Sequence, residues 1–277
     1  MDGSWVARGC NRGLSAKGRF CRAGVAHRRP GRRRPYEDIS DEQRGCLARG
    51  VSELVDGYGL IHPRYGSVAL RSEGKLIVVD TGAGPPKGRL LDEMAAKGVD
   101  REDVDLVVIT HLHGDHIGGN LIDGRPVFPK ARYLVSRADW EYWTGPEVLK
   151  GVSAVQEQAV PLEGLAILDL IEGEYAITGE LTTLPTPGHT PGHISLAIHS
   201  AGKRGFILGD VAHSPAQAQY TDWSPAFDVD PAVSPGTRHA IFDRLEAEGS
   251  LISAGHMPGQ GFGRLVREGG RRYWQVS

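Results

Sequence analysis

The chain has 277 residues, of which 40% are hydrophobic and 24% charged, so it can form a substantial core in one large domain or two small ones. Its net charge of −2 hides an asymmetry, because residues 1–35 carry ten Lys and Arg against the single acid Asp2, whereas residues 36–277 carry 22 bases against 33 acids. This mildly acidic main part argues against nucleic acid as a partner. No run approaches the roughly 18 apolar residues that cross a membrane, so no membrane partner is expected.

The first 35 residues are rich in Arg and Gly, which predicts a disordered basic leader ahead of one domain over residues 36–277. We favour an unstructured leader or a start-site artefact over a nucleic-acid-binding arm or an organelle transit peptide. The leader lacks the apolar centre of a signal peptide. Cys10, Cys21 and Cys46 are odd in number and make no disulfide framework, so we expect a reducing compartment and a cytoplasmic protein.

The predicted elements follow from apolar periodicity and turn residues. Spaced apolar side chains allow a helix over residues 36–58, and a β-hairpin follows over residues 67–80. A helix over residues 88–97 ends at Gly98. The later elements are strands over 105–110 and 127–136, an interrupted helix from 139 to about 158, strands over 194–199 and 204–210, a helix over 235–249, a strand over 251–256 and a closing hairpin over 263–274.

Residues 110–119 read Thr-His-Leu-His-Gly-Asp-His-Ile-Gly-Gly, a dense set of metal-binding side chains. Because alternate residues of an extended chain point to one side, His111 and His113 can bind one ion together. Asp115 and His116 follow in the next turn and can serve a second position beside the first. The preceding strand delivers this cluster to a loop at its carboxyl end, where the sites of layered α/β folds lie. The pattern predicts a metal centre in preference to a polar loop that caps a strand.

The motif Thr-His-x-His-x-Asp-His-x-Gly-Gly resembles the signature of the metallo-β-lactamase-fold hydrolases. The resemblance implies an α/β fold of the αββα sandwich type, with two mixed β-sheets flanked by helices. Members usually open the first sheet with strands that have no clear equivalent before Gly66, so we expect this sheet to be incomplete at its N-terminus. The resemblance also implies that Asp80 supports the site from behind by orienting a ligating histidine, although a simple strand-end turn is the alternative.

Later segments supply further ligands by the same resemblance. Prolines and glycines around His189 set a rigid loop that presents this side chain. His193 matches a position outside the ligand set, and we expect it to make structural hydrogen bonds. The motif match places the ligands in two sets, a first ion on His111, His113 and His189 and a second on Asp115, His116 and His256, with Asp210 bridging. Imidazole and carboxylate ligands suit two divalent ions, with zinc preferred over manganese, cobalt or iron.

The expected chemistry follows from two adjacent ions. Such a pair can share a water and lower its pKa from about 15.7 to near 7, which supplies a bridging hydroxide at neutral pH. The hydroxide attacks an electrophilic carbonyl or phosphoryl centre. Asp210, His213 and Asp115 are the catalytic candidates, because His213 could donate to the oxyanion and Asp210 could pass a proton to the leaving oxygen.

The substrate is predicted at the level of a class. The sequence Thr-Pro-Gly-His-Thr-Pro-Gly-His, with the later Gly-Asp and Ala-Gly-His, is similar to the quorum-quenching lactonases. Those enzymes commonly have a tyrosine where this chain has His213, and in this respect the chain resembles the methyl parathion hydrolase branch. We therefore expect hydrolysis of lactones or aryl esters, with organophosphate triesters as a side activity. The alternatives are a β-lactam hydrolase, a glyoxalase-II-like thioester hydrolase and a non-catalytic metal-binding protein.

Two aromatic segments are expected to line the pocket of a small-molecule substrate. The first is Asp139-Trp-Glu-Tyr-Trp143, for which a role in the core is the alternative. The second is the Pro-rich stretch 214–236, which holds Tyr220, Trp223 and Phe227 and reads as one long loop. Uncovered edge strands would permit a homodimer.

Overall fold

The computed structural model of the chain describes residues 5–7, 23–25 and 64–277. Of the basic leader it describes two short strands, β1 (Trp5–Ala7) and β2 (Ala23–Val25), which pair antiparallel. The helix expected over residues 36–58 and the three cysteines lie outside the described residues, so those expectations stay predictions.

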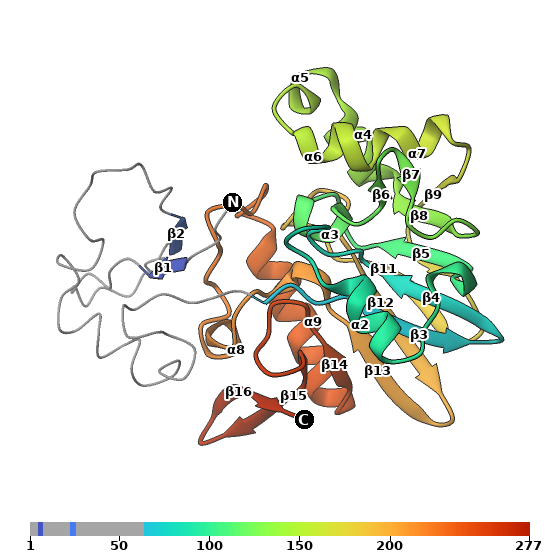
Figure 1. Cartoon of the computed structure of the whole chain (residues 1–277). Helices are drawn as coiled ribbons and strands as arrows, with labels where there is room; N and C mark the ends of the chain where they lie inside the picture. The colour runs from blue at the N-terminus through green and yellow to red at the C-terminus, as the bar shows by residue number, and fades with distance from the viewer. Residues whose placement is uncertain (1–4, 8–22, 26–63) are drawn as a thin grey trace.

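Two mixed sheets organise the described domain (Figure 1). The first has the order β3-β4-β5-β8-β9, with β3 and β4 antiparallel and the other neighbours parallel. Its strands are β3 (Val68–Ser72), β4 (Lys75–Val79), β5 (Leu106–Ile109), β8 (Arg132–Ser136) and β9 (Leu168–Ile171). In the part of the chain that is described, β3 is the edge of this sheet, and the expected incompleteness at the N-terminus stays a prediction because residues 26–63 lie outside that part.

The second sheet has the order β10 to β16 and is antiparallel except between β13 and β14. Its strands are β10 (Tyr175–Ala176), β11 (Leu181–Pro185), β12 (Ile194–Ser200), β13 (Lys203–Ile207), β14 (Leu251–Ser253), β15 (Phe262–Glu268) and β16 (Arg271–Val276). The last two form the predicted closing hairpin around Gly269 and Gly270, which both adopt positive φ.

The sheets pack face to face because their strands are apolar on both sides. In β4, Ile77 and Val79 join the core between the sheets, where they meet Leu181 and Leu196 of the second sheet. The alternate residue Val78 belongs to a different core, beneath the outer helices. Because this strand is covered on both faces, all four residues of Leu76-Ile-Val-Val79 are buried. Burial on both faces explains why the segment is a continuous apolar run.

Helices cover the outer face of each sheet. On the first sheet, Met94, Trp140, Val155 and Leu162 bring helices into one core with the strands. These helices are α2 (Leu90–Ala96), α4 (Arg137–Thr144), α5 (Pro146–Leu149), α6 (Ser153–Gln158) and α7 (Val160–Gly164). On the second sheet, α9 (Ser234–Glu248) packs through Phe242 and Leu245. No helix among the described residues is long and apolar enough to cross a membrane.

Several predicted elements differ from those in the structure. The strand expected over 127–136 begins only at Arg132, because the turn at Pro129 separates it from the small hairpin of β6 (Leu121–Ile122) and β7 (Arg125–Pro126). The predictions contain no strand at β9, which the structure pairs with β8. The expected loop over 214–236 contains the one-turn helix α8 (Ala216–Gln219) and the start of α9.

Close approach of two loops explains why glycines end the first donor motif. The Thr81 amide donates to the His116 carbonyl at 2.7 Å, and the Thr81 hydroxyl donates to Asn120 Oδ1 at 2.9 Å. A Cβ added to Gly119 would lie 2.4 Å from the Thr81 carbonyl oxygen. Only glycine allows the loop after β4 to press against the loop after β5.

We predict that Gly119→Ala lowers the free energy of unfolding by about 1–3 kcal/mol, the usual cost of overpacking, because backbone atoms must move. The matched control is Gly236→Ala in α9, where an added Cβ meets nothing within 4 Å. This change should be neutral or stabilise by about 0.5–1 kcal/mol. Denaturant unfolding measures both variants, and equal stability of the two would contradict the close-approach argument.

Candidate metal centre

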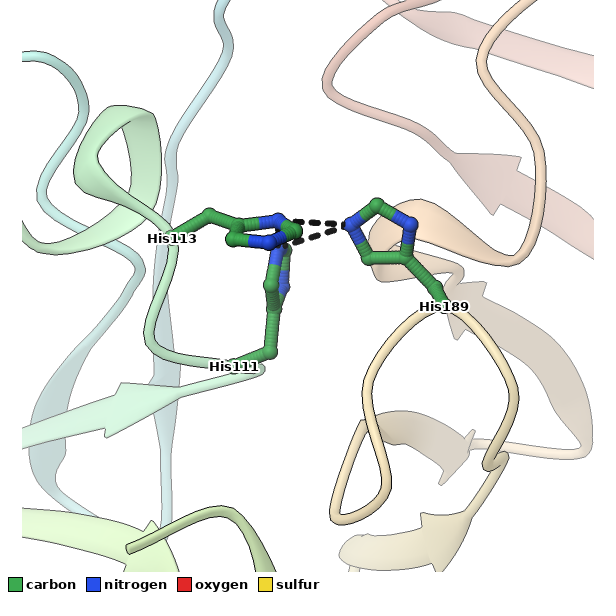
Figure 2. Close-up of side chains that lie close together, drawn as sticks. All are labelled: His111, His113 and His189. Carbon is green, nitrogen blue, oxygen red and sulfur yellow. Dashed lines mark hydrogen bonds between the residues drawn. The ribbon is translucent and has the colours of Figure 1, made fainter. Parts of the chain in front are cut away.

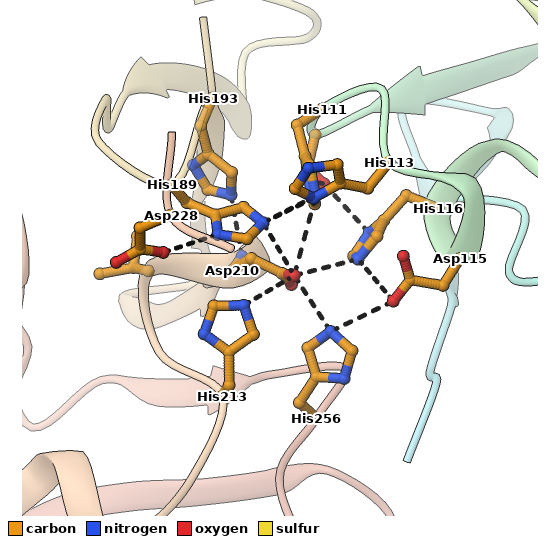
Figure 3. A network of polar contacts seen from close by, with 12 residues as sticks. His111, His113, Asp115, His116, His189, His193, Asp210, His213, Asp228 and His256 are labelled. Carbon is orange, nitrogen blue, oxygen red and sulfur yellow. Dashed lines mark hydrogen bonds and ion pairs between the residues drawn. The ribbon is translucent and has the colours of Figure 1, made fainter. Parts of the chain in front are cut away.

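The donor side chains come from loops that follow the strands of both sheets (Figure 3). After β5 the chain runs through His111 and His113 into the short helix α3 (Gly114–Ile117), which carries Asp115 and His116. From the second sheet, His189 lies in the loop between β11 and β12. The 3-10 helix η3 (Gly209–Val211) after β13 carries Asp210, and His256 follows the parallel neighbour β14.

The first group of donors is a triangle of histidines (Figure 2). The ring atoms His111 Nε2, His113 Nδ1 and His189 Nε2 lie 2.8–3.1 Å from one another. Each ring nitrogen has a single N–H or lone pair in the ring plane, so hydrogen bonds cannot satisfy all three contacts together. A tetrahedral ion with Zn–N bonds of 2.0–2.1 Å places its ligand nitrogens about 3.3–3.4 Å apart, close to this spacing.

The second group consists of Asp115, His116 and His256. One ligand atom from each lies within 4.8 Å of the other two. The Asp115 carboxylate is 3.7 Å from His116 Nε2 and 3.6 Å from His256 Nε2. The donors of residues 110–119 therefore divide between two neighbouring groups, and their assignment to two ions stays a prediction.

Asp210 lies between the two groups (Figure 3). Its Oδ2 atom is 3.4 Å from His189 Nε2 and 3.7 Å from His111 Nε2 in the first group. The same atom is 3.3 Å from His116 Nε2 and 3.0 Å from His256 Nε2 in the second. One carboxylate oxygen thus faces both positions at once, which is the geometry expected of a bridging ligand.

His213 reaches the same carboxylate from the side of the second sheet. Its Nε2 atom is 3.0 Å from Asp210 Oδ2, and the side chain is almost completely buried. His189, Asp210 and His213 also form a compact donor group of their own. The structure therefore brings together the seven predicted ligands and His213, the predicted donor to the oxyanion.

Partners behind the cluster fix how three of the rings present their nitrogens. Asp80 Oδ2 is 2.7 Å from His116 Nδ1, and Asp228 Oδ1 is 2.9 Å from His189 Nδ1. His256 Nδ1 donates to the Arg64 carbonyl at 2.7 Å. In each ring the partner binds Nδ1, so Nε2 is the nitrogen that faces the other donors. Asp80 thus contacts His116 from behind, and its role in orienting a metal ligand stays a prediction.

The triangle of histidines is suited to bind metal because its rings are neutral. Burial lowers the pKa of His111 and of His189 well below 6.5, and it lowers the pKa of His113 to about 4. Neighbouring imidazoles lower these pKa values further, because two charged rings in contact repel each other. At pH 7 all three rings therefore carry free lone pairs, the form that a metal requires.

In the second group, the carboxylates raise the pKa of a histidine instead of leaving it lowered by burial. At Asp210 burial favours the neutral acid, but His116 and His256 outweigh it and hold the pKa of this carboxyl well below its usual value. At His116 burial opposes the charged ring, yet Asp210 and Asp80 raise its pKa well above 6.5. The local negative charge that raises this pKa also favours a divalent cation.

Two buried atoms of the cluster lack hydrogen-bond partners in the part of the chain that the structure describes, as expected where a cation binds. Within the described residues, His116 Nε2 and Asp210 Oδ1 are buried and have no hydrogen-bond partner. His116 Nε2 lies 3.3 Å from Asp210 Oδ2, with which it forms an ion pair when the ring is protonated. Buried polar atoms of this kind are costly unless a ligand satisfies them. The donors are imidazole and carboxylate without thiolate, which suits zinc and similar divalent ions.

Two further buried groups hold the donor loops together. Asp139 accepts hydrogen bonds from the Leu112 amide at 2.8 Å and from the Gly192 amide at 3.0 Å, so it links the two histidine loops. Burial raises its pKa to about 6. His193 Nε2 accepts from the Asp210 amide at 2.8 Å. The expected structural hydrogen bonding of His193 is therefore confirmed.

Aromatic side chains from three segments surround the donors. The Trp143 ring lies 5.1 Å from that of His113, and the Phe227 ring lies 4.9 Å from that of His213. Tyr65 lies 5.5 Å from His256 and is 43% exposed, which places it at the rim. Of the predicted pocket walls, Trp143 and Phe227 contact the donor cluster.

Sequence reasoning missed several supporting residues. These are Asp139, Asp228, Ser234, Arg238 and the carbonyl of Arg64. Asp228 and Arg238 follow no recognisable spacing. Only their chemistry could have identified them in the sequence. A buried acid such as Asp228 or a buried arginine such as Arg238 needs a charged or polar partner.

The sequence pattern of the Metallo-beta-lactamase superfamily matches residues 66–256. The N-acyl homoserine lactonase AttM of Rhizobium radiobacter is 34% identical over 122 residues, which cover 43% of this chain and 44% of that protein. The N-acyl homoserine lactonase of Bacillus thuringiensis is 27% identical over 168 residues, 61% of this chain and 62% of that protein. The chain thus matches less than two thirds of the length of these relatives.

Two solved structures share the fold. The hydrolase AbOPH, described as in the beta lactamase superfamily, has a TM-score of 0.78 and 25% identity, with 87% of this chain and 88% of that chain covered. The dizinc quorum-quenching lactonase AidC, solved with a product, has a TM-score of 0.74 and 21% identity, with 85% of each chain covered. Since the family pattern spans well over half of the sequence and these structures share its two-sheet arrangement, the chain belongs to the metallo-beta-lactamase superfamily.

Proposed function

We propose that the chain is a dinuclear metal-dependent hydrolase that opens lactones, with aryl esters as further substrates. The observation that carries this proposal is the position of Asp210 Oδ2, which lies 3.0–3.7 Å from ring nitrogens of both donor groups. The two curated relatives above are lactonases by name, and AidC is a dizinc lactonase, which supports both the substrate class and the nuclearity.

The assignment of ligands follows the two donor groups. We assign the first position to His111, His113 and His189 and the second to Asp115, His116 and His256, with Asp210 shared. Two divalent ions, zinc foremost, would supply Lewis acidity and lower the pKa of a shared water toward about 7. Asp80 and Asp228 hold His116 and His189 so that their lone pairs stay directed at these positions.

The remaining groups act on the substrate. We assign to His213 a hydrogen bond to the substrate oxygen on which negative charge develops, because its ring lies beside Asp210 and faces the same centre. After the attack, Asp210 would take up the proton that remains on the attacking oxygen and pass it to the leaving oxygen as the ring of the lactone opens. Trp143 and Phe227 lie at 5.1 and 4.9 Å from the rings of donor-cluster histidines, where they exclude water and contact an apolar acyl group.

A substrate panel tests the reaction class. Purified protein is assayed with an N-acyl homoserine lactone, an aryl ester, an organophosphate triester and a β-lactam under the same conditions. We expect the highest kcat/KM for the lactone, a measurable value for the aryl ester and the lowest for the β-lactam. Preference for the β-lactam, or no turnover of any substrate by protein with full metal content, would reject the proposal.

Metal removal should abolish the activity and also lower stability. We expect about two divalent ions per chain by elemental analysis, since the chain offers two donor groups. Chelation should abolish lactone hydrolysis and lower the thermal midpoint, because the ring nitrogens of the histidine triangle lose the cation that satisfies them. Added zinc should restore both properties. Full activity without metal would remove the dinuclear assignment.

Replacing His213 should separate catalysis from metal binding. We predict that His213→Ala lowers kcat about a hundredfold or more while the metal content stays at the wild-type level. His199→Ala is the matched control, because His199 is exposed on β12 and should leave kcat unchanged. Metal analysis accompanies the kinetics, and loss of one ion in the His213 variant would make His213 a ligand instead.

A further inference from the structure

Arg238 of α9 is completely buried behind the donor cluster, and its guanidinium makes four hydrogen bonds. Nε donates to the Val211 carbonyl at 2.6 Å, next to Asp210 in the chain. Nη1 donates to the carbonyls of Thr221 and Trp223 at 2.8 and 2.7 Å. One side chain thus ties α9 to two separate points of the backbone between Val211 and Trp223, the segment that carries His213.

A chain of hydrogen bonds through two side chains links the same guanidinium to the metal centre. Arg238 Nη2 donates to Ser234 Oγ at 2.8 Å, and Ser234 Oγ donates to Asp228 Oδ2 at 2.6 Å. Asp228 Oδ1 then accepts from His189 Nδ1 at 2.9 Å (Figure 3). The direction of this path is fixed, because arginine can only donate and an ionised carboxylate can only accept.

A buried cation at this place is not explained by packing alone. Arg238 Nη2 is 3.7 Å from Asp228 Oδ2, and both side chains are completely inaccessible. Burial lowers the pKa of Arg238 to about 10, so the group is still charged at pH 7. Apolar residues of similar size often stabilise a core as well as a buried ion pair does. The forked arrangement of N–H donors indicates instead that the guanidinium fixes the positions of the groups that it binds.

We propose that Arg238 is a positioning residue of the metal centre, which acts on His189 through Ser234 and Asp228 and on His213 through the carbonyls of Val211, Thr221 and Trp223. The inference rests on the proposed function, since His189 must be a ligand for its orientation to matter. Arg238 touches neither substrate nor donors directly, so its effect must appear in how tightly and in which geometry the cluster binds metal.

The chain offers a matched control in Arg272 of β16. This arginine is also buried, at 6% exposure, and it packs over Phe242 of the same helix α9. Its guanidinium binds Asp243 and Glu246 of α9 and no residue of the donor loops. Arg272→Met therefore removes a buried guanidinium and a contact to α9 without cutting any link to the metal centre.

Cobalt binding by the apo protein is the decisive measurement, because the visible absorption of bound Co²⁺ reports ligand geometry independently of activity. For Arg238→Met and for Ser234→Ala we expect Co²⁺ affinity to fall about 10- to 100-fold and the absorption bands to change. Arg238→Lys keeps the charge but not the forked donors, so it should fall between Arg238→Met and the wild type. Arg272→Met should lower the thermal midpoint and leave cobalt affinity and spectrum unchanged.

The outcomes separate this proposal from a purely structural role and from the proposed function. If Arg238→Met does not fold, Ser234→Ala still tests the path, because it removes one hydroxyl and keeps the cation. Folded variants that bind Co²⁺ with wild-type affinity and spectrum would overturn the positioning role alone. The same loss of affinity in Arg272→Met would also overturn it. A wild-type chain that binds no Co²⁺ would remove both proposals.

Discussion

The structure depends on holding electron-rich atoms close together in a buried place. Asp210 Oδ2 and the facing nitrogens of His111, His116, His189 and His256 lie within 3.7 Å, where lone pairs repel one another and water is scarce. Such an arrangement is unfavourable for isolated side chains. It persists because other parts of the fold hold the rings of His116, His189 and His256 from behind, and because the converging atoms suit a cation.

The two sheets divide this task. The first sheet supplies the loop with four donors, and Asp80 from the neighbouring strand end holds one of them. The second sheet supplies His189, Asp210 and His256, and the parallel pairing of β13 with β14 brings the last two to the same edge. Asp139 joins the halves by accepting from the amides of Leu112 and Gly192. The site is therefore a property of the packed sandwich and not of either sheet alone.

Local chemistry decided what could be predicted from the sequence. Residues 110–119 predict a metal centre, because the spacing of ligands in an extended segment and the turn after it depends only on residues close in sequence. The buried strands β4 and β5 are recognisable from continuous apolar runs. By contrast, β9 is only partly buried and carries Asp169 in its centre, so its four residues show neither a continuous run nor a clear alternation.

The supporting groups escaped prediction for a different reason. Asp228 meets His189 across 39 positions, and Arg238 meets Val211 across 27, so no spacing rule connects them. Their partners are also often main-chain atoms, as with the Arg64 carbonyl that binds His256 across 192 positions. Main-chain partners leave no trace in residue type. The sequence pattern predicted candidate donors that the fold brings together, whereas the residues that orient them could be identified only from the folded structure.

The way Arg238 holds its loop has an evolutionary consequence. Its guanidinium donates hydrogen bonds to the main-chain carbonyls of Val211, Thr221 and Trp223. Every amino acid has this carbonyl, so these hydrogen bonds do not depend on which side chains the loop carries. Side chains of this segment can therefore vary and reshape the pocket wall that we propose, while the donor side chains keep their positions. A single buried guanidinium would then let the pocket change while the donor cluster is preserved.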